Sequence, residues 1–449
     1  MLFTAIVALF IVGYLCIALE HVLKVNKAAT ALLMFVGTWT LLMVGGAGEF
    51  FAGSSDFAHD VTKAIEHHLG EAGTTLFFLM GAMTIVEVVD QSGGFNFVRG
   101  MLASKSKKSL MWKVAFMTFI LSAILDNLTT SIVMVMILRK LVADKKDRLI
   151  YASLVVIAAN SGGAFSPIGD VTTIMIWNKG FITAGQVIIE LFVPSLVSMV
   201  VPAFLLSFML KGNLPEVEDQ SAGEGVTDLT RRQRQVVFAV GVGGLIFVPI
   251  FKSITHLPPF VGILLVLGLL WTVTEIFYRH LPEHSEEGGT QKRITNILSR
   301  IDMATILFFL GILMAVGCLQ EIGALTMMGE GLNTAFAGNN YLITGIIGIL
   351  SSIVDNVPLV AGCLGMYNPS MGGEFVCDGM FWQLLAYCAG VGGSMLIIGS
   401  AAGVVVMGLE NISFGWYLKN ITWLAAVGYV AGIAAYAVQH GIFTQLGII

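Results

Sequence analysis

The chain is poor in charge. Only 12% of its 449 residues are Asp, Glu, Lys or Arg, whereas an average soluble domain carries roughly 25%. The 24 basic and 29 acidic side chains could not cover the surface of a soluble protein of this length. A net charge of −5 without a concentrated basic patch is also unsuited to binding nucleic acid. These shortages exclude a cytosolic enzyme and a nucleic-acid-binding protein.

Cysteine is scarce as well. The chain has five, an odd number, and Cys16, Cys318, Cys363 and Cys388 lie in apolar segments where a thiol packs as a small hydrophobe. A secreted disulfide scaffold is therefore excluded. The first apolar run, 2–19, lacks the basic start of a secretory signal. We expect it to stay in the protein as a permanent helix.

Apolar residues, by contrast, dominate: 56% of the chain is hydrophobic and the mean hydropathy is +0.85. Crossing a bilayer as a helix takes about 20 apolar residues. Segments of that kind recur from end to end, at about 2–19, 28–46, 73–89, 155–177, 187–210, 235–252, 259–278, 303–319, 383–408 and 418–438. The sequence therefore predicts an all-α polytopic membrane protein.

Two further apolar segments, 111–141 and 341–367, carry Asp-Asn pairs near their middles. Each could be one interrupted span or a re-entrant hairpin. If both segments turn back, 21 of the 24 basic residues lie on one side of the membrane. The other side then has only Lys63, Lys179 and Lys252. The positive-inside rule then makes the rich side cytoplasmic. We expect two re-entrant hairpins, with both termini outside, in the periplasm.

An internal repeat supports this arrangement. Residues 76–79 (LFFL) recur at 307–310, 120–127 (ILSAILDN) at 349–356 as ILSSIVDN, and 159–169 at 389–399, with offsets of 231, 229 and 230. Three ordered matches at nearly one offset indicate duplication. Each half has five crossings, and since five is odd, the second half must be inverted. Inverted repeats with interrupted helices are typical of secondary transporters.

The predicted organisation is therefore two inverted repeats. Each contains five transmembrane helices, one of them broken, and one re-entrant hairpin. The first repeat is 1–215, with hairpin 111–141 and broken helix 155–177. A cytoplasmic linker covers 216–234. The second repeat is 235–449, with hairpin 341–367 and broken helix 383–408.

Four interruptions should meet near the middle of the membrane: the two hairpin tips and the breaks at 160–173 and 390–400. Pro167 and the glycines of the first break free backbone carbonyls, and hydroxyls and carboxylates add further oxygens. Oxygen ligands suit hard cations. The predicted site for Na⁺ and H⁺ comprises Asp126, Asn127, Thr129, Thr130, Asn160, Ser161, Ser166, Asp170, Thr172, Thr173, Ser351, Asp355, Asn356 and Ser394.

Asp126, Asp170 and Asp355 carry this prediction. A carboxylate at the centre of a spanning helix costs about 2.5–3.5 kcal/mol on insertion scales. No Lys or Arg lies near these acids within their segments, so we expect no structural salt bridge. They could cap the broken helices in protonated form, or hold either a proton or a cation. Burial favours the protonated form of a carboxylate, so protons can compete with metal ions. By contrast, His59, His67 and His68 should be solvated.

The first tip (126–130, DNLTT), the long motif of the first break (160–173, NSGGAFSPIGDVTT) and the second Asp-Asn tip closely resemble NhaD-type sodium/proton antiporters. These belong to an ion-transporter superfamily that includes divalent anion/sodium symporters and arsenite pumps. The resemblance covers essentially the whole chain. It implies a bacterial or organellar inner membrane, exchange of internal Na⁺ or Li⁺ for external H⁺, and a homodimer. We expect no cofactor, no enzymatic activity and no nucleic-acid partner.

Rival functions remain open. A Na⁺-coupled di- or tricarboxylate symporter, or an oxyanion exporter, should offer neutral donors or arginine to its substrate, and acids at both tips argue against them. The carboxylate-symporter relatives have Ser-Asn-Thr where this chain has Asp-Asn. An intramembrane aspartyl protease would use two acids but leaves the duplicated tip unexplained.

Overall fold

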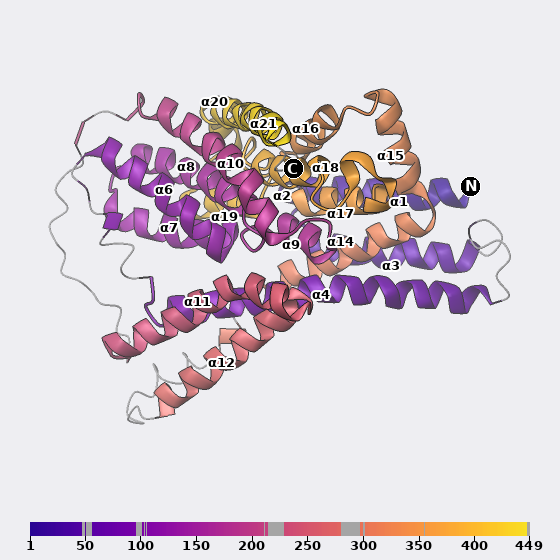
Figure 1. Cartoon of the computed structure of the whole chain (residues 1–449), viewed down its shortest axis with the longest axis horizontal. Coiled ribbons are helices and arrows are strands. Elements are labelled where there is room, and N and C mark those ends of the chain that lie inside the picture. Colours follow the sequence, from indigo (N-terminus) through magenta and orange to yellow (C-terminus); the bar gives the residue numbers. More distant parts are fainter. Residues whose placement is uncertain are drawn as a thin grey trace.

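The computed structural model describes residues 1–46, 50, 56–95, 101–102, 104, 106–210, 212–213, 229–279, 297–299, 301–353 and 355–446. Within these ranges every regular element is helical, and strand pairing is limited to one isolated bridge between Ser106 and Asn213. The predicted all-α fold is confirmed (Figure 1). Most of the linker expected at 216–234 lies outside the described residues.

The described α-helices, in chain order, are α1 (Leu2–Ala18), α2 (Glu20–Leu23), α3 (Lys27–Gly45), α4 (Phe57–Gln91), α6 (Lys107–Leu125), α7 (Asn127–Leu141), α8 (Lys145–Ala164), α9 (Val171–Asn178), α10 (Ala184–Leu206), α11 (Arg231–Thr255), α12 (Pro259–Arg279), α14 (Met303–Glu321), α15 (Ala324–Ala335), α16 (Asn340–Ser351), α17 (Asn356–Met366), α18 (Met380–Gly392), α19 (Ala401–Glu410), α20 (Phe414–Asn420) and α21 (Thr422–Gln445). Two short 3₁₀ turns, Pro369–Met371 and Gly373–Phe375, precede α18.

Among the described helices, eight are long and apolar enough to cross a membrane. The predicted span 418–438 includes the end of α20 and most of α21, which are separate helices. Two larger departures from the predicted spans concern α4 and α15. Helix α4 has 35 residues and so is about 52 Å long, because a polar helical extension precedes the apolar segment 73–89. The amphipathic helix α15 was not predicted, since its 12 residues mix apolar and polar side chains and fall below crossing length.

Helices α6 and α7 form a hairpin that turns at Asp126. The Lys107 ammonium, at the start of α6, lies 2.5 Å from the Asp147 carboxylate at the start of α8. The Tyr151 hydroxyl of α8 donates a hydrogen bond of 2.8 Å to the Lys107 carbonyl. Since α8 begins four residues after α7 ends, both open ends of the hairpin lie together. Helix α6 is long enough to cross a bilayer, yet α7 returns to its starting face.

Helices α16 and α17 form the second hairpin, which turns at Asp355. At its open end the Asn340 amide of α16 donates to the Glu374 carboxylate at 2.6 Å. Tyr367, directly after α17, stacks on Phe375 with ring centroids 5.0 Å apart. Both contacts are with the loop before α18. The second hairpin therefore opens where α18 begins, as the first opens where α8 begins.

The two broken helices run antiparallel. Glu410, at the end of α19, accepts a hydrogen bond of 2.7 Å from Arg148 at the start of α8. At the other end of the pair, the backbone amide of Thr183, after α9, donates to the Asp378 carboxylate before α18 at 2.6 Å. The hairpin and broken helix of the second half thus repeat those of the first half upside down. This is the inverted repeat expected from the sequence.

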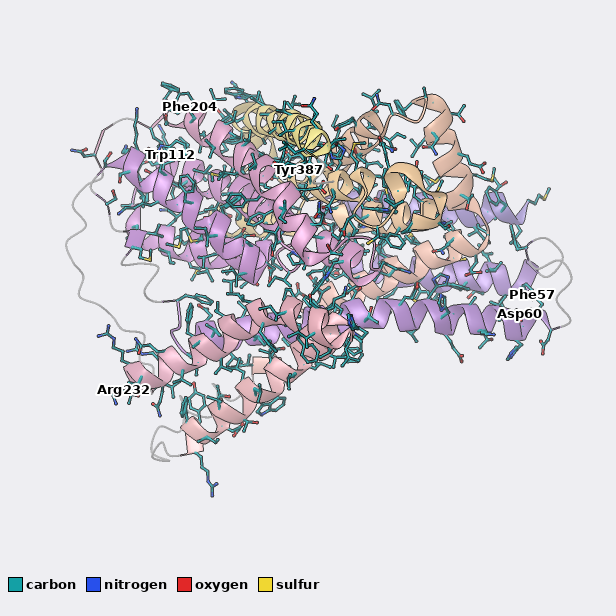
Figure 2. All side chains as sticks on the ribbon, in the orientation of Figure 1. Phe57, Asp60, Trp112, Phe204, Arg232 and Tyr387 are labelled. Atoms are coloured by element: carbon teal, nitrogen blue, oxygen red, sulfur yellow. The ribbon has the colours of Figure 1, made fainter. Side chains whose placement is uncertain are left out.

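Two faces of the molecule follow from these contacts. At the basic face α6 and α8 begin and α7 and α19 end, and Lys107, Arg139 and Arg148 gather there. At the opposite face, which we call the termini face, α9 ends and α18 begins. Lys179, after α9, pairs with Glu71 in the polar extension of α4 at 2.5 Å. Figure 2 places Arg232 and Asp60 near opposite ends of the long axis.

Both ends of the chain lie at the termini face. The side chain of Leu2 packs beside Gly45 at the end of α3, and α4 starts from that end. At the other terminus, the Gln439 amide of α21 donates to the Ile189 carbonyl near the start of α10 at 3.0 Å. An even number of crossings, as predicted from the sequence, would place both ends on one side.

The histidine expectation is wrong for His68. Its ring is buried, with 6% of its surface exposed, and Nε2 lies 2.8 Å from the Glu321 carboxylate of α14. The polar extension of α4 packs against α14 here, so the residue is not solvated.

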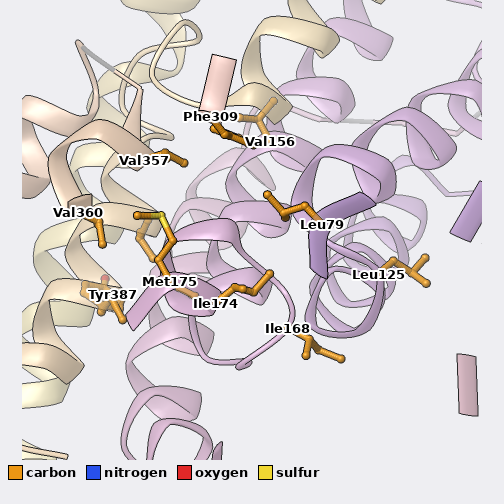
Figure 3. Packing of buried hydrophobic residues seen from close by; sticks show 14 of the residues in the cluster. Leu79, Leu125, Val156, Ile168, Ile174, Met175, Phe309, Val357, Val360 and Tyr387 are labelled. Atoms are coloured by element: carbon orange, nitrogen blue, oxygen red, sulfur yellow. The ribbon is translucent and has the colours of Figure 1, made fainter. Parts of the chain in front are cut away.

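The helices divide into two groups. The frame consists of α1, α3 and α4 from the first half and α11, α12 and α14 from the second, which pack on one another. The hairpin group consists of α6–α9 and α16–α19, with α10 and α21 packed against it. Figure 3 shows Val357 and Val360 of α17 beside Met175 of α9, where the two halves share an apolar core.

Glycine permits the close approach of hairpin and broken helix in each half. A Cβ atom on Gly162 of α8 would lie 2.2 Å from the Phe119 carbonyl oxygen of α6. One on Gly392 of α18 would lie 2.2 Å from the Gly348 carbonyl oxygen of α16. Any larger residue would force the helices apart. The repeated ANSGG and AGVGG motifs therefore encode the same helix packing twice.

Candidate cation site

The first hairpin tip is a strained turn around Asp126. Asp126 has φ of 108°, a backbone conformation that costs a non-glycine residue about 1–3 kcal/mol. Its carboxylate caps α7: one oxygen accepts from the Thr129 amide and the other from the Thr129 hydroxyl, both at 2.8 Å. Thr130, the next residue, has a buried hydroxyl without a hydrogen-bond partner among the described residues.

The second hairpin tip has a different environment. Asp355 has φ of −46° and caps α17 through the Val357 amide. Its other oxygen lies 2.9 Å from the Lys27 ammonium at the start of α3. The expectation that no salt bridge involves the three acids is therefore wrong for Asp355. The partner comes from 328 residues away in the sequence, so the segment around the acid gave no sign of it.

The two breaks are capped in parallel ways. Asp170 caps α9 by accepting from the Thr172 amide at 3.3 Å, and Ser400 caps α19 by accepting from the Gly403 amide at 3.2 Å. Serine and aspartate are about equally good caps. A neutral hydroxyl thus performs at the second break the capping role that Asp170 performs at the first. The negative charge of Asp170 is not needed for capping.

An amide bridge joins the first tip to both breaks. The Asn127 amide donates to the Asn160 side-chain carbonyl at 3.1 Å. The Asn160 amide in turn donates to the Ser394 and Ser400 hydroxyls at 3.0 and 2.9 Å. All four side chains are buried. The network therefore brings residues of α7, α8 and the second break into one polar cluster.

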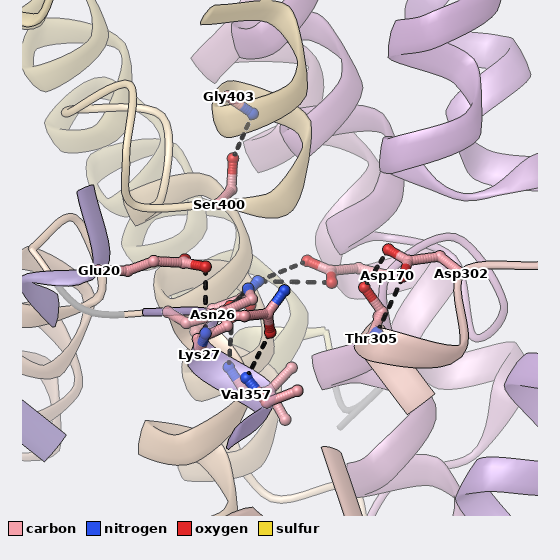
Figure 4. A network of polar contacts seen from close by, with 12 residues as sticks. Glu20, Asn26, Lys27, Asp170, Asp302, Thr305, Val357, Ser400 and Gly403 are labelled. Atoms are coloured by element: carbon pink, nitrogen blue, oxygen red, sulfur yellow. Dashed lines mark hydrogen bonds and ion pairs between the residues drawn. The ribbon is translucent and has the colours of Figure 1, made fainter. Parts of the chain in front are cut away.

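The second tip reaches across to the first break. The Asn356 amide lies 3.5 and 3.4 Å from the two Asp170 carboxylate oxygens. Figure 4 shows Asp170 in one close-up with Lys27 and with Ser400 of the second break. Gly390 of α18 packs against the same group, since a Cβ there would lie 2.9 Å from an Asp170 oxygen. Asp170 is 1% exposed. Both halves thus contribute to its surroundings.

Other predicted site residues use their hydroxyls elsewhere. Ser161 accepts from Ser198 of α10 at 2.9 Å, and Ser166 donates to the Ala123 carbonyl of α6 at 2.5 Å. Ser351 donates to the Ala389 carbonyl at 2.8 Å. Thr173 donates to the Ala164 carbonyl at 3.3 Å. These side chains connect helices in the structure and do not join the cluster around Asn160 and Asp170.

Two residues that contact the predicted site residues were absent from the predicted set. Ser400 occupies the position that corresponds to Asp170 in the repeat, and that alignment was the signal that could have included it. Lys27 begins an apolar span directly after the capping residue Asn26. A lysine at that position is ordinarily a boundary residue in contact with headgroups, so its contact with Asp355 could not be read from the sequence.

A cavity of about 300 Å³ lies between the frame and the hairpin group on the side of the termini face. Helices α4, α9, α14 and α17 line it, and its polar lining includes His68, Glu71, Asn178, Lys179 and Gln320. It provides polar surface where the two groups of helices meet, outside the buried cluster.

Known proteins similar to this chain are transporters. The profile of the citrate transporter family (CitMHS) matches residues 7–382. Sodium/proton antiporter 1 of Arabidopsis thaliana is 44% identical over 98% of this chain and 73% of its own length. Sodium/proton antiporter 2 of the same plant is 42% identical over 96% and 98%. The Na⁺/H⁺ antiporter NhaD of Alkalimonas amylolytica is 30% identical over 96% and 89%.

Among solved structures, the YdaH transporter of Alcanivorax borkumensis aligns with 93% of this chain and 98% of its own, with a TM-score of 0.55 at 11% sequence identity. That likeness concerns the fold. The relatives span nearly the whole chain, and they carry the names that the tip and break motifs led us to expect. This multi-pass membrane protein belongs to the NhaD-type sodium/proton antiporters, within the family matched by the citrate transporter profile.

Proposed function

We propose that this protein exchanges Na⁺ or Li⁺ for H⁺ across a bilayer, with Asp126 and Asp170 binding the cation and the proton in competition. The observation that carries the proposal is the environment of these two acids. Neither has a cationic partner among the described residues, and Asp170 bears a charge that its capping role does not require. Relatives along the whole chain are named sodium/proton antiporters.

The surrounding groups suit a hard cation. The Asn127 and Asn160 carbonyls and the free Thr130 hydroxyl add oxygen ligands near Asp126 and Asp170. The ends of α6 and α8 add carbonyl groups at the negative ends of helix dipoles. Thr129, Thr172, Ser394 and Asn356 complete the proposed site.

Exchange follows from competition. A proton on either acid removes the charge that attracts the cation, and a bound cation disfavours the proton. A carrier that changes conformation only when these acids hold a cation or a proton then exchanges the cation for the proton.

We further propose alternating access. Inverted repeats give two pseudo-equivalent conformations around one site. The division of the helices into a frame and a hairpin group suggests that the second group moves against the first. The repeat bounds 1–215 and 235–449 remain part of this proposal.

The charge distribution suggests the orientation. The basic face would be cytoplasmic and the termini face external, in a bacterial or organellar inner membrane. We also propose a homodimer without enzymatic activity.

A Na⁺-coupled symport of citrate or another carboxylate is the second candidate, because the matching family profile is described as a citrate transporter. The site disfavours it: Asp126 and Asp170 would repel a carboxylate substrate, and the described cluster around them contains no arginine.

Flux measurements on proteoliposomes separate the two candidates. With radioactive sodium inside and a proton gradient imposed from outside, the antiporter should drive sodium efflux that needs no carboxylate. Matched vesicles containing labelled citrate provide the comparison. Citrate uptake that depends on Na⁺, without exchange driven by the proton gradient, would replace the proposal with symport.

A further inference from the structure

The two hairpin tips differ in the cation available to them. Asp355 contacts the Lys27 ammonium at 2.9 Å, whereas Asp126 contacts the neutral Thr129. The side chains of Lys27 and Asp355 are 23% and 12% exposed. The pair is thus half-buried, so each charge has lost much of its water and depends on the other for compensation.

Several contacts hold Lys27 in place. Its backbone amide donates to the Glu20 carboxylate at 3.1 Å, and Asn26 caps the helix that it begins. Its ammonium also lies 4.3 Å from the centre of the Phe308 ring of α14, a favourable cation–π distance. The frame therefore presents this ammonium at the second tip, as Figure 4 shows for Lys27 beside Glu20 and Asn26.

An ammonium and an alkali ion bind a carboxylate in the same way, as monovalent cations in contact with its oxygens. One carboxylate oxygen of Asp355 already contacts Lys27, and the other accepts from the Val357 amide of the capped helix. The second tip also has Pro358 where the first has Thr129, so it lacks the hydroxyl and the amide donors at that position. An additional cation would have to displace Lys27.

We propose that the Lys27 ammonium occupies the cation position of the second hairpin tip, so that the chain binds one alkali ion, at the first tip, and not two. This inference rests on the proposed function and sets the number of ions in it. Lys27 acts as a positioning residue: it neutralises Asp355 and does not touch the transported ion.

Counting bound sodium tests the proposal. Equilibrium dialysis of the purified full-length chain against radioactive sodium, at saturating sodium, should give one ion per chain. The Lys27→Met variant frees Asp355 and should give two, a twofold rise. Lys27→Arg keeps the charge and should return the count to one. A merely structural role for Lys27 would lower the affinity or the stability and would not raise the number of ions.

Two further variants complete the test. Lys179→Met breaks another lysine–carboxylate pair between the frame and the hairpin group, and its count should stay at one. Asp355→Asn should also keep the count at one, which remains informative if Lys27→Met does not fold.

Each outcome is decisive. Two ions in the wild type, one ion in a folded Lys27→Met variant, or a loss of the bound ion in Asp355→Asn would overturn the proposal. A wild type that binds no sodium would instead overturn the proposed function.

Discussion

The two hairpin tips descend from one repeated sequence, ILSAILDN and ILSSIVDN, and the structure has given them different environments. At the first tip Asp126 has a strained backbone and two donors from Thr129. At the second, Asp355 has an ordinary backbone and the ammonium of Lys27. The helix packing around them remains alike, since Ser122 and Ser351 bond equivalent carbonyls, those of Ala159 and Ala389.

This comparison distinguishes the residues that pack the helices together from the residues that differ in charge at the candidate site. The duplicated residues that persist in both halves, such as Gly162 and Gly392, position the hairpins against the broken helices. Other residues differ between the halves. An acid, Asp170, caps the helix after the first break, whereas the neutral Ser400 caps the helix after the second. The first tip and the first break thus carry acids without a cationic partner among the described residues. The predictions below test that asymmetry, from the largest effect to the smallest.

The first prediction is that Asp126→Asn abolishes Na⁺-driven proton movement in vesicles. The amide keeps the size of the side chain but loses the charge that binds the cation. We expect a loss of at least ~100-fold, or about 2.7 kcal/mol. Size-exclusion profiles should match the wild type. Near-normal exchange by this folded variant would make Asp126 a helix cap only.

The second prediction concerns Asp355→Asn, which should reduce the rate by about tenfold, since it leaves the Lys27 ammonium half-buried without its partner. Removing both charges in Lys27→Met/Asp355→Asn should recover most of that loss. The measurement is the initial rate of proton-driven sodium efflux for the wild type, both single variants and the double variant. A double variant as impaired as Asp355→Asn would show that the carboxylate acts independently of Lys27.

The third prediction is that Asn160→Ala weakens apparent sodium affinity about fivefold to tenfold. The substitution removes the amide that joins Asn127 to the two serines of the second break. Each buried polar group that is left without a partner costs about 1–3 kcal/mol. The readout is the sodium concentration that gives half-maximal exchange. Asn178→Ala, at the cavity on the termini face, is the control and should leave that concentration unchanged. Equal apparent sodium affinity in the wild type and in Asn160→Ala would show that the amide bridge does not contribute to ion binding.

The fourth and smallest effect is expected from the matched pair Ser122→Ala and Ser351→Ala. Each variant loses one hydroxyl–carbonyl hydrogen bond, of 2.6 and 2.8 Å, at a cost of about 1 kcal/mol. Thermal unfolding in detergent should show similar shifts for both. A shift confined to one of the two variants would indicate that the packing of the halves is not equivalent.

Much of this arrangement could be read from the sequence, because it depends on local signals. Proline, glycine and charge inside apolar runs placed the breaks, and the constant offset of the repeat placed the hairpins. Acids such as Asp170 stood out because an unpaired charge is costly in a membrane.

The rest depends on long-range contacts. Lys27 contacts Asp355, which lies 328 residues away in the sequence. The hydropathy pattern of neither segment predicts that contact. Hydropathy could not show that α4 continues as a helix before its apolar part, since residues such as His67 and Glu71 are polar. The hydroxyls of Ser161 and Ser166 were expected at the site because they belong to its motif, but their direction depends on how α8 packs against α10 and α6.

The most direct test of the central claim is a sodium titration of the purified protein by calorimetry between roughly pH 6 and 9, in buffers of different ionisation enthalpy that count released protons. If Na⁺ and H⁺ compete for Asp126 and Asp170, binding must release protons, by linkage. The apparent Kd should then weaken by up to about tenfold per pH unit at the acid end for one proton displaced, and level off at the alkaline end. A sodium affinity independent of pH across this window, with no proton release, would contradict the account.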